Sequence, residues 1–156
     1  AMLRHQDAVA VSPQVMATGI RAARWPARMQ HLGAGPLTAL AGTRELWLDG
    51  GHNADAGAAV ARHFAGRRLH LVIGMMANKD PQALVAPLGE TLASVQVVAV
   101  PGKESHAAAA FGPGATAARD VSAALAALPD DSLPVLIAGS LYLAGEVLRL
   151  NRELPD

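Results

Sequence analysis

The sequence predicts an α/β fold: a doubly wound, mostly parallel sheet with helices on both faces. Three observations support this. A short apolar run that ends in small or polar residues is followed by a helical stretch, and this pattern occurs four times. The apolar runs do not alternate with polar residues, which indicates strands buried on both faces. The length of 156 residues suits one domain with a sizeable core.

Two elements precede the repeated pattern. Residues 12–25 predict a short helix, because Ser12 can act as its N-cap and Pro13 suits its first position. Residues 26–32 open with a proline and predict an edge strand, and residues 33–43 are rich in turn-forming residues. The repeated pattern begins after them.

Each strand of the repeated pattern is followed by a helix. Asp80 and Pro81 have the residue types preferred at the N-cap and first position of a helix, and Ser140 is a further N-cap. The alanine-rich stretch after the third strand is interpreted as a helix, a Gly/Pro turn and a second helix. The predicted strands and helices are 45–49 with 50–66, 69–74 with 75–90, 95–100 with 101–112 and 115–128, and 133–139 with 140–154.

These elements also suggest the domain boundaries. Ala1 stands before Met2, as a residue left by an expression vector does, so we expect the natural protein to begin further upstream. We assign residues 1–24 to a linker with an N-terminal helix and residues 25–156 to the α/β domain.

The composition excludes several classes of protein. Thirteen basic and thirteen acidic residues cancel and no basic run occurs, which argues against nucleic-acid and membrane-surface binding. The chain has no cysteine, which excludes a disulfide framework and a thiolate metal site. No apolar stretch is long enough to cross a bilayer and no leader is recognisable, so we expect a cytoplasmic protein.

Polar residues gather where the predicted strands end. Ligands of an open parallel sheet bind beyond the carboxyl ends of its strands, where the loops converge. In "LWLDGGHNADAG", residues 46–57, Asp49 ends a strand, and two glycines allow a tight turn and a close approach to the backbone. His52 and Asn53 then stand at the start of a helix, whose free N–H groups and dipole favour an anion. The stretch predicts a phosphate-binding corner, with Asp49 available to a ribose or a cation.

The residues themselves leave simpler roles open. Asp49 and Asn53 can be caps of the turn and the helix, with His52 exposed to solvent. Lys79 is either a ligand of a carboxylate or phosphate or an ordinary exposed lysine, and Ser140 can be only an N-cap. One Asp and one His fall short of a zinc site, so no metal ligand is expected, and no G-x-G-x-x-G follows a strand.

The chain resembles the C-terminal domain of the folylpolyglutamate synthase/dihydrofolate synthase family, within the Mur ligase superfamily. Four segments carry the resemblance in the family's order and spacing: "RWPARMQ", "LWLDGGHNADAG", "LVIGMMANKDP" and "VLIAGSLYLAGEVLRL". The similarity spans about residues 12–151. This chain departs from the family pattern at three positions. Ala27 stands where family members usually have Gly, Gly51 where they have Ala, and Ala54 where they have Pro. These exchanges of small residues keep the ionic groups.

The resemblance implies an ATP-dependent, amide-forming ligase of folate biosynthesis and one-carbon metabolism. ATP would phosphorylate the carboxylate of dihydropteroate or of a folate's terminal glutamate. The amino group of L-glutamate would then attack this acyl phosphate. In the family, ATP lies between two domains, and the N-terminal ATP-binding domain holds the phosphate loop and most of the Mg²⁺ ligands.

The resemblance also implies roles for six residues. Arg28 would reach the ATP phosphates, Asp49 would contact the ribose side of the nucleotide, and His52 and Asn53 would lie near the phosphates. Asp49 and His52 are the expected catalytic residues, and replacing either by Ala should lower turnover while leaving the fold intact. The candidates for binding glutamate carboxylates are Lys79 and Ser140.

One part of the family's machinery is missing from these residues. No G-x-x-x-x-G-K-[ST] loop occurs, so we expect a C-terminal domain without its ATP-binding partner domain, and we expect the isolated fragment to be inactive. The alternative is a stand-alone nucleotide- or amino-acid-binding module without catalysis. The sequence does not choose between dihydrofolate synthase and folylpolyglutamate synthase activity.

Overall fold

The computed structural model describes residues 10–23 and 25–153. Within these residues, six strands form one sheet in the order β1-β2-β6-β3-β4-β5, and every neighbouring pair is parallel except β1 with β2. The predicted mostly parallel α/β sheet is therefore confirmed. The strands are β1 (Gln30–His31), β2 (Leu46–Asp49), β3 (Leu69–Ile73), β4 (Leu92–Val97), β5 (Ala115–Ala117) and β6 (Val135–Ala138).

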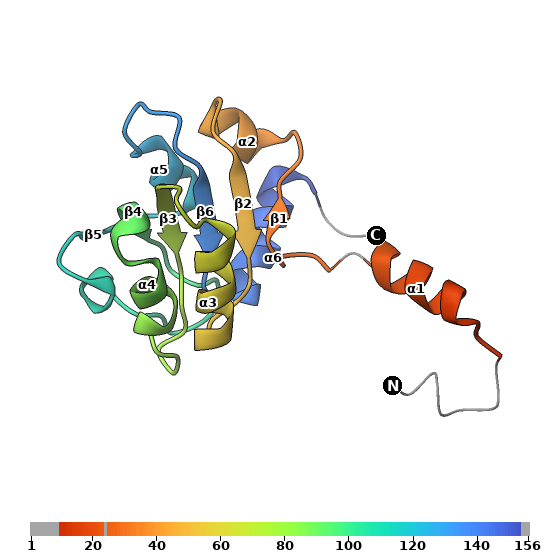
Figure 1. Ribbon diagram of the computed structural model, residues 1–156. Coiled ribbons are helices and arrows are strands. Elements are labelled where there is room, and N and C mark those ends of the chain that lie inside the picture. The colour runs from red at the N-terminus through yellow and green to blue at the C-terminus, as the bar shows by residue number, and fades with distance from the viewer. Residues whose placement is uncertain (1–9, 24, 154–156) are drawn as a thin grey trace.

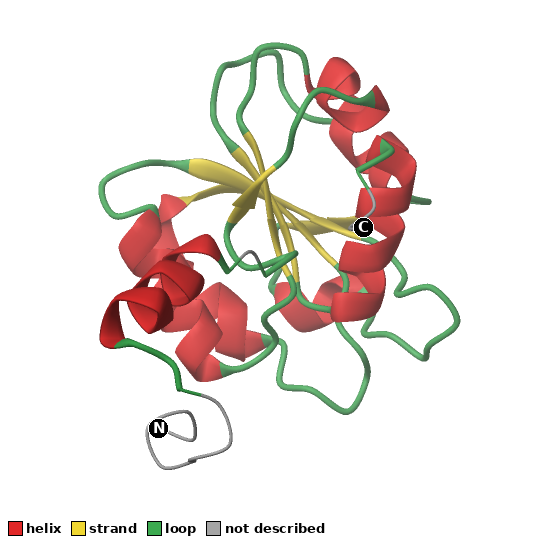
Figure 2. Cartoon of the chain, turned by 90° about the vertical axis from the view of Figure 1, so that its right-hand side faces the viewer, coloured by secondary structure: helices red, strands yellow, loops and turns green. Residues whose placement is uncertain are grey.

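Helices cover both faces of the sheet, as Figure 2 shows. Helices α3 and α4 pack together on one face, and α2 packs with α5 and α6 on the other. The doubly wound arrangement is therefore as predicted. The helices are α1 (Pro13–Ala22), α2 (Pro36–Ala41), α3 (Ala54–His63), α4 (Gln82–Leu88), α5 (Val121–Ala126) and α6 (Leu141–Asn151), with 3₁₀ turns at Gly89–Thr91 and Ala108–Phe111.

The central strands β3 and β6 are buried along their whole length. Leu71 and Leu136 belong to the core under α3 and α4, whereas Val72 and Ile137 belong to the core on the other face. Successive residues of a strand point to opposite faces, so both sets must be apolar. This explains why the sequence of these strands shows no alternation.

The alanine-rich region after β4 is not the helix pair that the sequence predicts. Residues 101–107 form turns, Ala108–Phe111 is a single 3₁₀ turn, and β5 replaces the start of the second predicted helix. Gly112, Pro113 and Gly114 interrupt any helix here, and β5 gains main-chain hydrogen bonds by pairing with β4. Tertiary pairing thus overrides the helix propensity of alanine.

Helix α2 lies in the stretch that the sequence predicts as turns. Pro36 occupies its first turn, and the side-chain Oδ1 of Asn151 accepts hydrogen bonds from the N–H groups of Leu37 and Thr38, at 3.1 and 3.3 Å. The capping side chain therefore comes from the end of α6, more than a hundred residues away. A local sequence pattern does not predict this cap.

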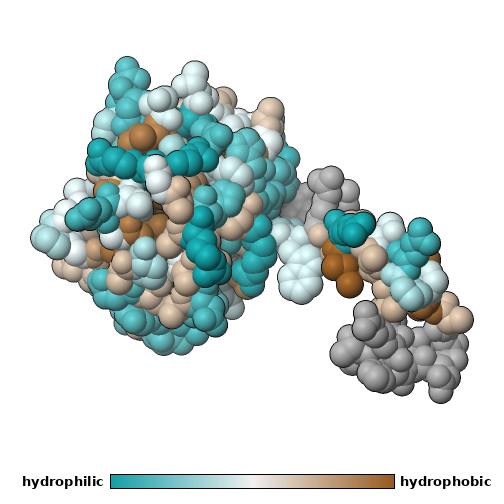
Figure 3. All heavy atoms as spheres, viewed as in Figure 1, coloured by the Kyte–Doolittle hydropathy of each residue, from teal (hydrophilic) through white to brown (hydrophobic). Residues whose placement is uncertain are grey.

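Helix α1, predicted from Ser12 and Pro13, stands away from the sheet (Figure 1), and none of its residues is buried. The Ser12 hydroxyl accepts from the N–H of Val15, as an N-cap does. Val15 and Ile20 are exposed, and Figure 3 shows apolar side chains on this helix. In the described part of the chain, no helix is long and apolar enough to span a membrane.

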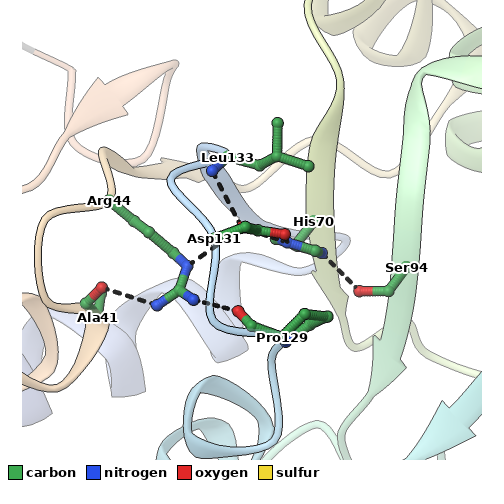
Figure 4. Close-up of polar contacts among 7 residues, drawn as sticks. All are labelled: Ala41, Arg44, His70, Ser94, Pro129, Asp131 and Leu133. Carbon is green, nitrogen blue, oxygen red and sulfur yellow. Dashed lines mark hydrogen bonds and ion pairs between the residues drawn. The ribbon is translucent and has the colours of Figure 1, made fainter.

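A buried polar network occupies the amino ends of the strands (Figure 4). The imidazole of His70 in β3 is 1 % exposed; its Nδ1 lies 2.8 Å from the Ser94 hydroxyl and its Nε2 3.1 Å from both carboxylate oxygens of Asp131. Burial raises the pKa of Asp131, but hydrogen bonds from His70 and the Leu133 N–H outweigh it and hold that pKa below its ordinary value.

Arg44 completes this network from the turn before β2. Its guanidinium donates to the carbonyl oxygens of Ala41 and Pro129, and its Nε lies 3.6 Å from Asp131. The loop before β6 is thereby tied to the chain segment before β2. The side chains at this edge therefore contact one another and nearby carbonyl groups.

Candidate functional site

The carboxyl end of β2 opens into a pocket of ≈ 330 Å³. Four of the predicted site residues, Arg28, Asp49, His52 and Asn53, lie in its wall. The volume is at the lower end of the range for small-molecule sites. The pocket is completed by Gly51, Asp55, Ala56 and Ala59.

Asp49 joins the two chain segments that form the pocket. Its side chain is 6 % exposed; Oδ1 accepts from the N–H of Gly51 at 2.6 Å, and Oδ2 accepts from the N–H of Met29 at 2.9 Å. These amides adjoin His52 and Arg28 in the sequence. The carboxylate therefore ties the segment that carries Arg28 to the turn that carries His52, and its negative charge is stabilised by both N–H groups.

His52 and Asn53 lie at the start of α3. Nδ1 of His52 is 3.4 Å from the carbonyl oxygen of Gly50, which can only accept, so this contact favours a proton on Nδ1 and a lone pair on Nε2. The Asn53 side chain accepts from the N–H of Ala56 at 2.9 Å and caps the helix. Asn53 therefore is a helix cap, one of the two roles that the sequence left open, and it also lies in the wall of the pocket.

Arg28 is exposed, and among the described residues its guanidinium has no hydrogen bond or ion pair. A Cβ atom placed on Gly50 would lie 3.5 Å from Nη1 of Arg28 and would overlap the side chain of Leu141. Gly50 therefore leaves room for the first turn of α6 beside the guanidinium. The positive charge of Arg28 remains available to an anion.

Asp55 is a pocket residue that the sequence analysis missed. It is exposed in the first turn of α3, and its carboxylate has no hydrogen bond among the described residues. Its position in the first turn of a helix, two residues after the predicted site residue Asn53, would have allowed its prediction from the sequence. Asp55 offers acceptor oxygens for hydroxyl groups, whereas both oxygens of Asp49 already accept backbone hydrogen bonds.

Lys79 and Ser140 are not in the wall of this pocket. Ser140 is 3 % exposed, and its hydroxyl accepts from the N–H of Tyr142, so it caps α6 as predicted. Lys79 is half-buried in the loop after β3, and its carbonyl oxygen accepts from Nε2 of His106 at 2.7 Å. The structure therefore separates these two candidates from the four pocket residues.

Two departures from the family pattern have structural consequences. Ala27 is buried at φ 56, in the left-handed region that favours glycine, which explains the glycine usual there. A Cβ atom on Gly51 would overlap the Ala56 side chain and lie 2.7 Å from Oδ1 of Asp49. Glycine at this position therefore permits the short hydrogen bond that Asp49 makes.

A second hollow, of ≈ 350 Å³, lies between β1 and α2. Its walls are mostly main chain and small side chains, and its one guanidinium, that of Arg44, is engaged with Asp131 and two carbonyl groups. We therefore take the pocket at the carboxyl end of β2 as the candidate site. Among the described residues, no three His, Asp or Glu side chains gather as a metal ion requires.

Comparison with known proteins adds independent evidence. The sequence matches the family model "Mur ligase, glutamate ligase domain" over residues 27–141, which is most of the chain. The chain belongs to this family. The matched part of this glutamate ligase domain contains every predicted site residue, from Arg28 to Ser140.

Individual relatives support the same assignment. This glutamate ligase domain is 29% identical over 150 residues to the folylpolyglutamate synthase of Lacticaseibacillus casei, covering 88% of this chain and 32% of that protein. A bifunctional folylpolyglutamate synthase/dihydrofolate synthase from Yersinia pestis CO92 superposes with a TM-score of 0.74 at 23% identity, over 95% of this chain and 36% of that one.

A further structure, of a bifunctional folylpolyglutamate synthase/dihydrofolate synthase with Mn, AMPPNP and L-glutamate bound, has a TM-score of 0.73 at 23% identity, over 95% of this chain and 37% of that one. The chain thus spans about a third of the length of these relatives. The predicted resemblance to the C-terminal region of this family is confirmed.

Proposed function

We propose that this domain supplies part of the ATP and L-glutamate sites of a ligase that adds L-glutamate to dihydropteroate or a folate. The observation that carries the proposal is the pocket beside β2, where Arg28, Asp49, His52 and Asn53 meet. The similarity to folylpolyglutamate synthases supports the choice of substrates. The relative with AMPPNP and L-glutamate bound supports the pairing of a nucleotide with this amino acid.

The reaction proceeds in two balanced steps. A carboxylate oxygen of the folate substrate attacks the γ-phosphorus of ATP, and ADP leaves. The amine of L-glutamate then attacks the acyl carbon, inorganic phosphate leaves, and the amine loses a proton as the amide forms. Charge neutralisation and positioning dominate the first step.

The pocket residues suit these requirements. The guanidinium of Arg28, unpaired within the described part of the chain, can neutralise phosphate charge, and the first turn of α3 adds N–H groups that favour an anion. His52, with its lone pair on Nε2, can accept a proton from the attacking amine. Asp49 would contact the ribose side of the nucleotide as a catalytic residue, and its carboxylate also links the segments that carry Arg28 and His52.

Mg²⁺ has no ligand set in the described part of this chain, since Asp49 is engaged with two backbone N–H groups and Asp55 stands alone. We place the metal and the phosphate loop in an N-terminal ATP-binding domain of the same polypeptide. No Walker-type loop occurs in this sequence. The domain by itself should therefore not ligate glutamate.

The test uses the full-length gene product and its ATP-dependent ligation of L-glutamate. We expect His52→Ala to lower kcat/KM at least about 100-fold, because general acid–base and charge effects at a transition state have this size. Arg62→Ala is the matched control, since Arg62 is an exposed cation in the last turn of the same helix. Equal rates for both variants would remove His52 from the mechanism.

The isolated domain gives the second measurement. ATP should shift the backbone amide resonances of residues 50–55, and Arg28→Met should weaken this binding about tenfold, as the loss of a charge-assisted contact does. A full-length protein that binds ATP through these residues but ligates nothing would instead support the binding-module alternative.

A further inference from the structure

The backbone on both sides of Arg28 has an unusual conformation. Ala27 has a φ of 56° and Met29 a φ of 43°, in the left-handed region that residues with a Cβ atom rarely adopt. Among the described residues, the only other non-glycine residue with a positive φ is Arg152, which directly precedes Glu153. Such conformations persist where surrounding contacts impose them, and they concentrate at functional sites. The contacts around Arg28 therefore control where this cation is placed.

Three hydrogen bonds impose the conformation around Arg28. The carbonyl oxygen of Ala27 accepts from the N–H of Gly50 at 2.8 Å. The N–H of Met29 donates to Oδ2 of Asp49 at 2.9 Å. The third bond comes from a side chain of the same segment, because the N–H of Ala27 donates to Oε1 of Gln30 at 2.9 Å. Ala27 is 3% exposed, so its N–H depends on this acceptor.

The side chain of Gln30 is held in turn by Glu153, just beyond α6. Nε2 of Gln30 donates to Oε1 of Glu153 at 3.0 Å. Oε2 of the same carboxylate accepts from the N–H of Gly33 at 3.0 Å and from Nδ2 of Asn151 at 3.1 Å. An ionised carboxylate only accepts, so it selects the amide nitrogen of Gln30 and leaves the amide oxygen for Ala27. Glu153 therefore fixes the direction in which the Gln30 amide faces.

We propose that Gln30 is a positioning residue for the pocket, and that Glu153, acting through Gln30, fixes the place of the Arg28 guanidinium. Neither Gln30 nor Glu153 lies in the pocket wall. The inference rests on the proposed function only for the ligand, which is the phosphate of ATP bound by Arg28. A backbone that is held before binding lowers the entropic cost of ordering the arginine on its ligand. Loss of these hydrogen bonds should therefore weaken the binding of ATP through Arg28 alone.

The first test reverses the donor and the acceptor of the pair in the 156-residue chain. Gln30→Glu sets two carboxylates against each other and should weaken ATP binding about threefold to tenfold, measured from the amide shifts of residues 50–55. Combining Gln30→Glu with Glu153→Gln restores a donor opposite an acceptor, so the affinity should return to within about twofold of the unmodified chain. Gln14→Glu adds the same charge at an exposed position of α1 and should leave the affinity unchanged.

The second test separates positioning from a general loss of stability. Gln30→Met keeps the length of the side chain without its hydrogen bonds and should weaken ATP binding about as much as Gln30→Glu does. Adding Gln30→Met to Arg28→Met should weaken binding no further, because Gln30 acts only through Arg28. A merely structural role predicts that the two losses add. Additive losses, or a combined Gln30→Glu and Glu153→Gln variant that stays weak, overturn the proposal.

Amide hydrogen exchange reports the same contacts without any ligand. Exchange at Ala27 should accelerate in Gln30→Met, recover in the combined Gln30→Glu and Glu153→Gln variant, and stay unchanged in Gln14→Glu. Acceleration together with an unchanged ATP affinity would overturn the positioning role, because Gln30 would then hold the backbone without affecting the ligand.

The results distinguish failure of this inference from failure of the proposed function. If Arg28→Met weakens ATP binding and Gln30→Met does not, the positioning role is rejected and the nucleotide site is retained. If Arg28→Met binds ATP as tightly as the unmodified chain, the proposed role of Arg28 is rejected, and the positioning role is rejected with it.

Discussion

The two ends of the parallel strands differ in what their polar side chains contact. At the amino ends, His70, Asp131, Ser94 and Arg44 contact one another and nearby carbonyl groups. At the carboxyl ends, the guanidinium of Arg28 and the ammonium groups of Lys79 and Lys103 have no hydrogen bond or ion pair in the described part of the chain. Charged side chains that are satisfied internally stabilise a fold, whereas those that face a pocket remain available to a ligand.

The largest expected difference between the two ends is in two histidines. His70→Ala should lower the free energy of unfolding by about 3 kcal/mol, because it leaves a cavity and removes the partner of both Ser94 and Asp131. His52→Ala, at the carboxyl ends, should lower it by less than about 0.5 kcal/mol. Urea denaturation measures both. Equal losses would show that the two ends do not differ in this way.

Asp49 is the exception at the carboxyl ends. Asp49→Ala should cost about 2 kcal/mol, because two backbone N–H groups lose their acceptor, and hydrogen exchange at Met29 and Gly51 should accelerate. The variant is still expected to fold, as the sequence predicts, but with lower stability. Asp55→Ala, in the same pocket, is the control and should be neutral. An unchanged free energy of unfolding in Asp49→Ala would show that Asp49 does not join the two segments of the pocket.

Acid should weaken the amino ends. The folded-state pKa of Asp131 is depressed, so its stabilisation is present above the ordinary aspartate pKa of about 4 and is lost as the pH falls through the lower folded value. Unfolding free energies measured from about pH 6 to about pH 2 should fall less steeply in Asp131→Asn. Asp55→Asn should follow the unmodified protein. Parallel curves for all three would refute the assignment.

Opposing effects should nearly cancel at Ala27. Ala27→Gly relieves about 1 kcal/mol of left-handed strain, but it adds chain entropy to the unfolded state and removes a buried methyl group. The net change in unfolding free energy should be less than about 1 kcal/mol. Thermal denaturation at fixed pH measures it. A loss above about 2 kcal/mol would mean that the methyl group, not the backbone, decides this position.

The sequence predicts most of the fold because local patterns specify it. The apolar strands and the caps at Ser12, Asn53 and Ser140 depend on residues within a few positions of one another. Helix α2 and strand β5 escape prediction because their partners, Asn151 and β4, are distant in the sequence. Helix α4 begins at Gln82, one residue after the predicted first position at Pro81, and the Asp80 carboxylate accepts from the N–H of Gln82.

The site divides in the same way. Asp49, His52 and Asn53 share one strand-to-helix junction, so a single stretch of sequence predicts their proximity. Arg28 lies beside them because its neighbour Met29 donates a hydrogen bond to Asp49, twenty positions further along the chain. No local pattern predicts this contact, and Arg28 was assigned to the site only from the family resemblance.

The hydrogen bonds of Asp49 also have a mechanical consequence. The segment that contains Met29 and the turn that contains Gly51 are both hydrogen-bonded to the carboxylate of Asp49. A shift of this segment therefore also moves the turn that precedes His52. A displacement of the segment that begins at Ala27 would therefore reach the backbone beside Arg28 and the backbone beside His52 together.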